Sequence, residues 1–367
     1  MACFYLLKNG YKVGYVYDVK REIESFDAYN DILYQRKEAS FRSKQLSQYV
    51  DEWGISKFEN ADYEYKTHIP NENQDWARIG EDGIWVHQYF HTLKKNYDRE
   101  ITLYEKKSNN VVYRARYTTN SLGWRITSNE NNIKKGPSLV FMGCSFIFGE
   151  GLNNNQTFPY LLSERSGLQT YNLGVGASSP SWMLQTILES KINIINPADK
   201  NDKILFYVYI DDHFNRVIAN TKYLENEHRF NTEPYFYLEN NELKHKTTFS
   251  EMNLFKGYII RLLSKSNFMK VMRLSYPRIG DEQVNLFASI VHRIKILSMK
   301  NDSTIKDFYV VIWPGNKYKN SELINSLSKY DIKTINYGDL NLSYLLRNRD
   351  TQLKDGHPSA LTNDLLA

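Results

Sequence analysis

The sequence predicts an α/β protein: a three-layer sandwich in which helices cover both faces of a five-stranded parallel sheet, joined to a smaller N-terminal α+β region. Two observations favour this fold. After residue 135, five short apolar runs alternate with segments of helical periodicity, which is typical of parallel strands linked by crossover helices. Before residue 136, a charged helical stretch is followed by runs rich in Tyr, Thr and Val. We therefore expect an accessory region over residues 1–135 and the sheet domain over residues 136–367.

The accessory region divides into two parts. In the first 60 residues, apolar side chains such as Ile23, Phe26 and Tyr29 recur at helical spacing among many charges, which predicts mixed polar helix. Residues 60–135 contain runs of strand-forming residues at 101–104 and 111–117, separated by Asn and Gly turns. We therefore predict a small β-rich unit before the sheet domain.

Five apolar runs are the expected strands of the sheet, at residues 138–142, 169–173, 203–210, 307–313 and 332–337. Helices are expected over residues 157–166, from Pro180 to about residue 195, and over the C-terminal residues 360–367. Pro180 supports the second of these, because proline is favoured in the first turn of a helix.

Almost a hundred residues separate the third and fourth expected strands, which is too long for one crossover. We expect an insert here, at about 215–300. It contains an expected hairpin that turns at Asn240–Asn241, and a helix whose residues Val284, Phe287 and Val291 form a core-facing stripe. The insert is either a lid or substrate-recognition element, or a structural embellishment.

The composition excludes several classes of protein. The net charge of +5 is spread over the chain without a basic block, so nucleic acid is not an expected partner. The only cysteines, Cys3 and Cys144, give neither a disulfide framework nor zinc-ligand spacing, and we expect no metal and no cofactor. No run approaches eighteen apolar residues and no signal-peptide pattern opens the chain. We therefore expect no membrane span and, read literally, a cytoplasmic protein; the oligomeric state is left open.

A serine stands where the first strand of the expected sheet ends. Ser145 follows Gly143 and Cys144 after an apolar run, and the carboxyl edge of an open α/β sheet is where ligands bind. Its hydroxyl is a weak nucleophile until a base takes its proton. Asp355 and His357 near the C-terminus supply the residue types that activate such a serine. Read separately, Ser145 is a helix cap and the Asp355–His357 segment an exposed turn.

Two further polar segments follow strands of the expected sheet. Small residues at 174–179 let backbone N–H groups face a substrate oxygen, as an oxyanion hole requires; the rival interpretation as a dinucleotide loop lacks its third glycine. The second segment is Asp211, Asp212 and His213. These three consecutive side chains cannot all face one metal ion from an extended chain.

The order of these segments resembles that of the SGNH (GDSL-type) serine hydrolases, over about residues 136–367. GCSFIFGEGL is similar to the nucleophile block, YNLGVGAS to the second block, and DGHPSA to the block that completes the triad. TTNSLGWR at 118–125 is similar to the lead-in of bacterial members with an N-terminal extension. The resemblance implies a flavodoxin-like sheet, with Ser145 as nucleophile, His357 as base and Asp355 as its partner.

This chain departs from the family pattern at several positions. Cys144 replaces the Asp that precedes the nucleophile, which leaves Cys144 itself as an alternative nucleophile. The resemblance places the oxyanion donors at the backbone N–H groups of Ser145 and of Gly176 or Ala177. A third donor, usually an Asn, aligns with Asp211, Asp212 and His213. An ionised Asp accepts only, so either His213 or a protonated Asp212 donates, or this segment differs from that of the family.

The resemblance implies a serine esterase that cleaves O-acyl esters through an acyl-enzyme on Ser145. The expected substrate is a small molecule or glycan that carries an acetyl or other short acyl group. Two alternatives remain open: an O-acyltransferase that decorates a glycan with the same triad, and a catalytically inactive binding module of the same fold. The triad alone does not separate hydrolysis from transfer, because the outcome depends on how well the site excludes water.

Overall fold

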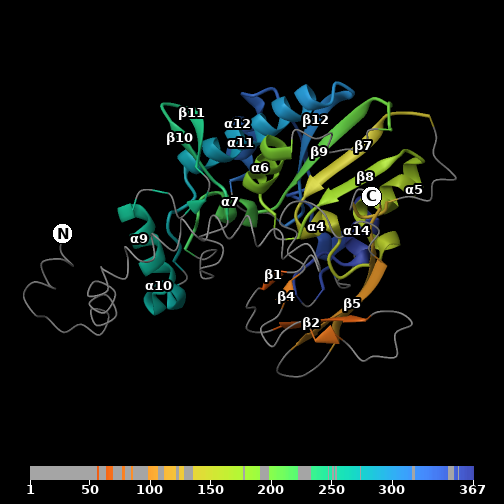
Figure 1. The fold of residues 1–367 in the computed structure, drawn as a ribbon, viewed down its shortest axis with the longest axis horizontal. Coiled ribbons are helices and arrows are strands. Elements are labelled where there is room, and N and C mark those ends of the chain that lie inside the picture. The colour runs from red at the N-terminus through yellow and green to blue at the C-terminus, as the bar shows by residue number, and fades with distance from the viewer. Residues whose placement is uncertain are drawn as a thin grey trace, which may run out of the picture. The chain divides into compact units, whose positions relative to one another are not determined.

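Residues 54–367 form one compact unit in the computed structural model of the chain (Figure 1). The structure describes residues 56–57, 63–68, 77–78, 84–85, 98–105, 111–120, 124–127, 135–176, 178–190, 198–221, 233–246, 248–249, 252, 254–272, 274–315, 319–345, 351–353 and 355–367. The helical stretch expected over the first 60 residues lies outside this set, except that Ser56–Lys57 form a short strand, β1.

A five-stranded sheet lies at the centre of the unit. Its strands are β7 (Ser138–Gly143), β8 (Thr170–Gly174), β9 (Lys203–Tyr209), β12 (Ile305–Ile312) and β13 (Lys333–Asn336). Their order is β13-β12-β9-β7-β8, and every neighbouring pair is parallel. This is the doubly wound, flavodoxin-like order, with the change of direction beside β7. All five predicted strands and the predicted fold class are therefore confirmed.

Helices cover both faces of the sheet, so the domain has three layers (Figure 1). One face carries α6 (Pro180–Ser190), α11 (Asp281–Asn301) and α12 (Asn320–Ser328), and the other carries α5 (Phe158–Ser166) and α14 (Ala360–Leu366). Alternate residues of β7 serve the two layers, since Val140 packs in the first core and Phe141 in the second. Strands buried on both faces need continuous apolar runs, which is why β7 is buried at all six positions.

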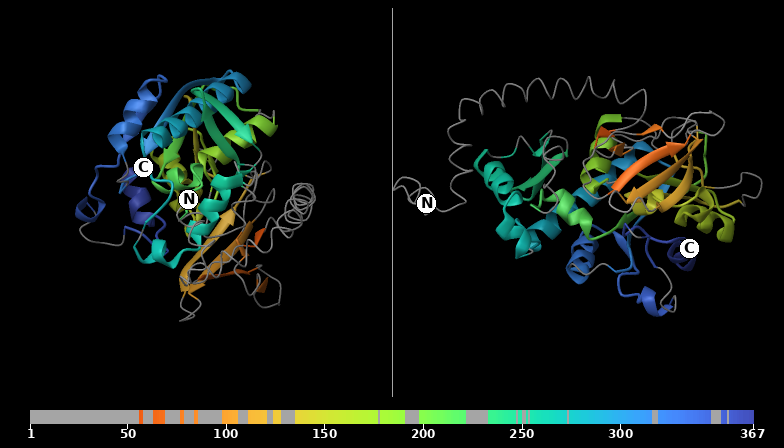
Figure 2. Two further views of the ribbon diagram at one scale, coloured as in Figure 1. Left: turned by 90° about the vertical axis from the view of Figure 1, so that its left-hand side faces the viewer. Right: turned by 90° about the horizontal axis from the view of Figure 1, so that it is seen from below.

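The insert is shorter than its predicted range of 215–300. The predicted hairpin forms as β10 (Tyr235–Glu239) and β11 (Glu242–Lys246), with Asn240 and Asn241 both at positive φ in the turn. Helices α9 (Leu254–Ser264) and α10 (Asn267–Val271) follow, and Figure 2 shows this segment from two further sides. Helix α11 belongs to the sheet layer instead, because Val284, Phe287 and Val291 are buried in the core against the strands.

An antiparallel sheet precedes the parallel one. It comprises β2 (Tyr63–His68), β3 (Ala77–Arg78), β5 (Asp98–Glu105) and β6 (Val111–Thr118), in the order β3-β2-β5-β6, while β4 (Ile84–Trp85) pairs with β1. The predicted β-rich unit is thus present. It is not separate from the sheet domain, because the compact unit spans residue 135 and Arg125 forms a β-bridge with Asn172 of β8.

Short helices fill several connections: α4 (Ser145–Phe148), the 3-10 helix η3 (Asn154–Gln156), α7 (Asp212–Val217) and α13 (Leu342–Leu345). Among the helices that the structure describes, none is both long and apolar enough to span a bilayer.

Candidate active site

Ser145 lies at the carboxyl edge of the parallel sheet, directly after β7. The chain leaves the strand at Gly143, passes through the extended residue Cys144, and turns at once into α4, which begins at Ser145. The carbonyl of Cys144 accepts the N–H of Phe148, so the turn closes immediately behind the serine. Ser145 is only 5% exposed. The nucleophile candidate therefore sits on a tight strand-to-helix turn with its side chain held in a fixed position.

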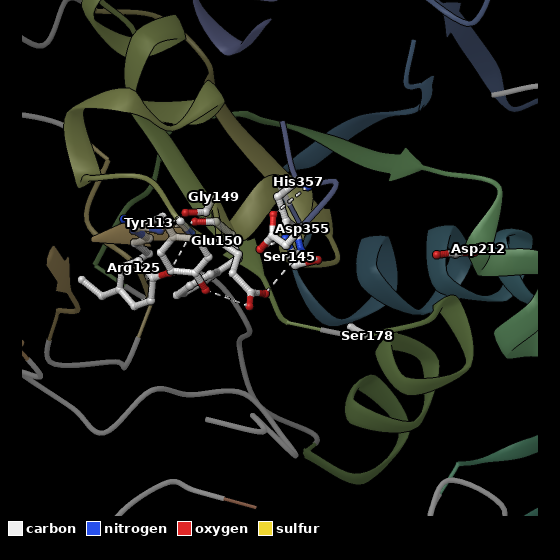
Figure 3. Close-up of polar contacts among 12 residues, drawn as sticks. Tyr113, Arg125, Ser145, Gly149, Glu150, Ser178, Asp212, Asp355 and His357 are labelled. Carbon is white, nitrogen blue, oxygen red and sulfur yellow. Dashed lines mark hydrogen bonds and ion pairs between the residues drawn. The ribbon is translucent and has the colours of Figure 1, made fainter. Parts of the chain in front are cut away.

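Ser145, His357 and Asp355 form a continuous hydrogen-bonded chain (Figure 3). Ser145 Oγ lies 2.9 Å from His357 Nε2, and His357 Nδ1 lies 2.9 Å from Asp355 Oδ2. With Nδ1–H donating to the carboxylate, Nε2 is left to accept the serine proton. The three residues come from the two ends of the domain, 212 positions apart in the case of Ser145 and His357.

The short spacing between Asp355 and His357 has a local explanation. Asp355 Oδ1 also accepts the backbone N–H of His357 at 3.2 Å, so one carboxylate holds both the main chain and the ring. The segment is closed by a hydrogen bond from Leu353 N–H to the carbonyl of His357, at 2.7 Å. Phe146 packs against the imidazole edge with ring centroids 5.8 Å apart. These contacts fix the orientation of the base.

Cys144 is poorly suited to be the nucleophile. Its thiol is buried in the apolar core on the α5 side of the sheet, and burial raises the pKa of Cys144. The thiolate is the reactive form of cysteine, so a raised pKa works against attack. The hydroxyl bonded to His357 belongs to Ser145.

The second strand end is built to pass close to the nucleophile turn. A Cβ at Gly174 would lie 2.2 Å from the backbone nitrogen of Phe148, so only glycine allows this approach. Asn172 is fully buried and ties the two segments together: its amide donates to the carbonyl of Ile147 at 2.8 Å and its oxygen accepts from Gly174 N–H at 2.9 Å.

Three of the predicted oxyanion donors are backbone N–H groups, those of Ser145, Gly176 and Ala177. Ser145 begins α4, so its N–H has no carbonyl one turn earlier to bond, and Gly176 lies in the turn that follows β8. Ala177 lies outside the described residues. These backbone groups stay predictions for the oxyanion hole.

Asp212 and His213 are not positioned as the sequence pattern leads one to expect. The Asp212 side chain is 61% exposed, 3.9 Å from the guanidinium of Arg216, and Figure 3 shows it well apart from the triad. His213 is fully buried, and its Nδ1 lies 2.5 Å from the hydroxyl of Tyr207. Burial holds the pKa of His213 well below its ordinary value, so the ring is neutral. Their positions favour a structural role in α7 over donation to a substrate oxygen.

Two charged residues reach the site that the sequence pattern did not single out. Glu150, 6% exposed, follows α4, and its Oε2 lies 3.5 Å from His357 Nε2. Arg216, 8% exposed, comes from α7, and its guanidinium donates to the carbonyl of Ser178 at 2.5 Å. The only sequence signal for Glu150 is its position between two glycines, Gly149 and Gly151. No sequence signal distinguishes Arg216.

The charge balance around His357 favours the imidazolium. Burial lowers the pKa of His357, but the carboxylates of Glu150 and Asp355 outweigh burial, and the pKa lies above its ordinary value. Arg216 acts in the opposite direction. Among the described residues, no group of three or more His, Cys, Asp or Glu side chains is arranged to hold a metal ion.

Taken together, the described residues make an α/β protein of doubly wound topology, in which Ser145, His357 and Asp355 form a hydrogen-bonded chain at the switch point of the sheet. No protein-family model matches the chain, and no curated protein matches it.

Several solved structures resemble the chain at low identity. A protein described as lipolytic and of the G-D-S-L family, from Desulfitobacterium hafniense, is 11% identical, with a TM-score of 0.30 over 63% of this chain and 95% of that one. A carbohydrate esterase whose active site displays divergent catalytic and non-catalytic binding functions is 10% identical, with a TM-score of 0.36 over 85% and 83%. A protein described as a GDSL-like lipase, from Bacteroides ovatus, is 11% identical, with a TM-score of 0.32 over 84% and 72%. Identities and scores this low assign neither a family nor a function to this chain.

Proposed function

We propose that this protein is a serine hydrolase that cleaves O-acyl esters through an acyl-enzyme on Ser145. One observation carries the proposal: Ser145 Oγ, both ring nitrogens of His357 and the Asp355 carboxylate are linked by successive contacts of 2.9 Å at the carboxyl edge of the sheet. This is the arrangement in which a histidine removes the serine proton while a carboxylate steadies the imidazolium that forms.

The reaction follows from these contacts. Ser145 Oγ attacks the ester carbonyl carbon while its proton passes to His357 Nε2. The tetrahedral intermediate collapses with cleavage of the bond to the alcohol oxygen, which takes the proton back from Nε2. Water then attacks the acyl-enzyme with His357 again as base, which releases the acid and restores Ser145. Asp355 stays ionised throughout and holds Nδ1–H.

The negative charge on the former carbonyl oxygen needs donors that are already in place. The backbone N–H groups of Ser145 and of the 176–177 turn are the proposed donors. Arg216 is the proposed third contributor, since its charge is close enough to lower the pKa of both Cys144 and His357. It would take the place of the side-chain amide that Asp212 and His213 do not supply.

The proposed substrate carries a small acyl group on a polar alcohol, and the side chains around the triad suit the alcohol part. Charged and hydroxyl-bearing side chains, namely Glu150, Tyr113 and Arg216, lie around the triad or beside its neighbours, and they suit a hydroxyl-rich scaffold such as a sugar.

A fluorophosphonate probe tests the proposal, because it labels only a serine activated by a base. We expect labelling of the wild-type chain and hydrolysis of p-nitrophenyl acetate, with both lost in Ser145→Ala and His357→Ala. Ser321→Ala, which removes an exposed hydroxyl on α12, is the matched control and keeps both activities. Absence of labelling in a folded wild-type chain contradicts the proposal and favours an inactive binding module. Labelling with slow hydrolysis that sugar acceptors accelerate favours acyl transfer.

A further inference from the structure

A second carboxylate approaches the catalytic base from the side of the nucleophile. Glu150 Oε2 lies 3.5 Å from His357 Nε2, the same nitrogen that contacts Ser145 Oγ at 2.9 Å. The other oxygen of the carboxylate, Oε1, accepts a hydrogen bond from the Tyr113 hydroxyl at 3.3 Å. In a triad, only the Nδ1 side of the ring is expected to face an acid. Here both ring nitrogens face one (Figure 3).

The backbone around Glu150 fixes where this carboxylate points. Gly149 and Gly151 both have a φ of 79°, a left-handed conformation that glycine adopts without strain, so Glu150 stands in a tight turn. Arg125 holds that turn by donating to the carbonyl of Gly149 at 2.7 Å. The Tyr117 hydroxyl accepts the N–H of Gly151 at 2.8 Å. A side chain placed this firmly, and 7% exposed, is not a solvated surface acid.

The placement has a chemical consequence for the proton on Nε2. When His357 is neutral, its Nε2 lone pair accepts from Ser145 and repels the nearby carboxylate. When His357 is protonated, Nε2–H has two acceptors within reach, Ser145 Oγ and Glu150 Oε2, and the carboxylate is the stronger of them. The imidazolium is then held between two acids, Asp355 and Glu150.

We propose that Glu150 is a positioning residue for the triad: its carboxylate competes with Ser145 for the Nε2 proton of His357 and so sets the pH above which the serine is activated. The proposal rests on the function proposed above. Among the described residues, the charged groups that face His357 come from three elements: Asp355 from its own segment, Glu150 from the turn after α4, and Arg216 from α7. Phe146, which packs on the ring, is uncharged.

The test is the pH dependence of kcat/KM for an acetyl ester in Glu150→Gln, which keeps the shape of the side chain and removes its charge. We expect the ascending limb to move to lower pH by about one to two units, since an opposite charge within 4–6 Å shifts a pKa by about that much. Loss of the carboxylate also makes His357 a weaker base, so the rate on the alkaline plateau falls. The profiles of the wild-type chain and Glu150→Gln therefore approach each other or cross as the pH falls.

Two further variants separate this role from a structural one. Glu164→Gln removes an equal charge from an exposed position on α5 and leaves the limb where it is. Glu150→Asp keeps the charge on a shorter side chain, so its ascending limb is expected to lie between those of the wild-type chain and Glu150→Gln. A Glu150→Gln profile that falls uniformly at all pH values, with its limb unmoved, overturns the proposal.

A readout that needs no turnover keeps this test distinct from that of the proposed function. The ring protons of His357 titrate in NMR spectra whether or not the chain hydrolyses esters. A lower midpoint in Glu150→Gln than in the wild-type chain supports the competition for Nε2 even if no ester is cleaved. An unchanged midpoint refutes it even if the wild-type chain is a good esterase.

Discussion

Arg125 offers the most direct test of how the N-terminal segment supports the nucleophile turn. Arg125 is 2% exposed, and its guanidinium donates to the carbonyls of Phe148 and Gly149, each at 2.7 Å, and to the carbonyl of Leu152. It also lies over the ring of Tyr117, 4.4 Å from the centroid. Burial lowers the pKa of Arg125 to about 10, so the group is still charged at neutral pH. Arg125→Met keeps the apolar stem and removes every donor.

The size of the effect follows from two of the three carbonyls, because the carbonyl of Gly149 also accepts the N–H of Leu152 at 3.1 Å and keeps that partner. Each buried acceptor left without a partner costs about 1–3 kcal/mol, which gives a gross loss of about 2–6 kcal/mol for the carbonyls of Phe148 and Leu152. Burying the guanidinium itself costs several kcal/mol that the variant no longer incurs. We therefore expect the free energy of unfolding to fall by about 2 kcal/mol in Arg125→Met. The free energy of unfolding of Arg125→Lys is expected to lie between those of the wild-type chain and Arg125→Met. An ammonium group keeps the charge but lacks the planar fork that reaches several acceptors at once.

Equilibrium unfolding in urea measures this loss, with the slope compared between variants to confirm that the same surface unfolds. Arg116→Met is the matched control, since Arg116 is an exposed arginine whose partner is the surface residue Asp98. An exposed ion pair of this kind contributes little to stability. Arg125→Met losing no more stability than Arg116→Met would show that the buried carbonyls do not depend on Arg125.

Three other changes test the site itself. Asp355→Asn leaves the local turn possible but removes the charge that steadies the imidazolium, so kcat for acetyl-ester hydrolysis is expected to fall by about 10²–10⁴-fold; a loss below tenfold contradicts the assignment. Arg216→Met removes a cation that lowers the pKa of His357, so the ascending limb of kcat/KM moves to higher pH, opposite to Glu150→Gln; a shift to lower pH is incompatible with this reasoning. Cys144→Ala costs about 1 kcal/mol of stability but keeps fluorophosphonate labelling, and loss of labelling in a folded variant points to the thiol.

The strands and the candidate site residues were predictable because each of them stands in a short, recognisable segment of the sequence. Each strand of the parallel sheet is buried on both faces and therefore reads as a short apolar run, as β7 does between residues 138 and 143. The carboxyl ends of parallel strands meet at one edge of the sheet, which is where ligands bind. A serine directly after the first apolar run is therefore a candidate site residue even before the other strands are placed. Asp355 and His357 are neighbours in sequence, and their contact forms within one turn.

The charged groups around His357 were not predictable, because their contacts depend on tertiary placement. Arg216 resembles many other arginines in the sequence until α7 brings it beside Ser178. Glu150 acquires its contact with His357 only when the C-terminal segment returns to the sheet edge. The same reason explains Asp212 and His213: their types suggested donors, but α7 turns one to the surface and the other into the core.

The bridge between Arg125 and Asn172 bears on how this protein can be recombined with others. Residues 124–127 precede the parallel sheet in sequence, yet Arg125 pairs with β8 and Thr127 Oγ1 donates to the carbonyl of Thr170 at 2.6 Å. A chimera joined at residue 135 would exchange these contacts for those of a foreign segment, while a chimera joined before β2 would carry them along. The unit to exchange is therefore the whole of residues 54–367, which keeps the N-terminal strands together with the turn that they contact.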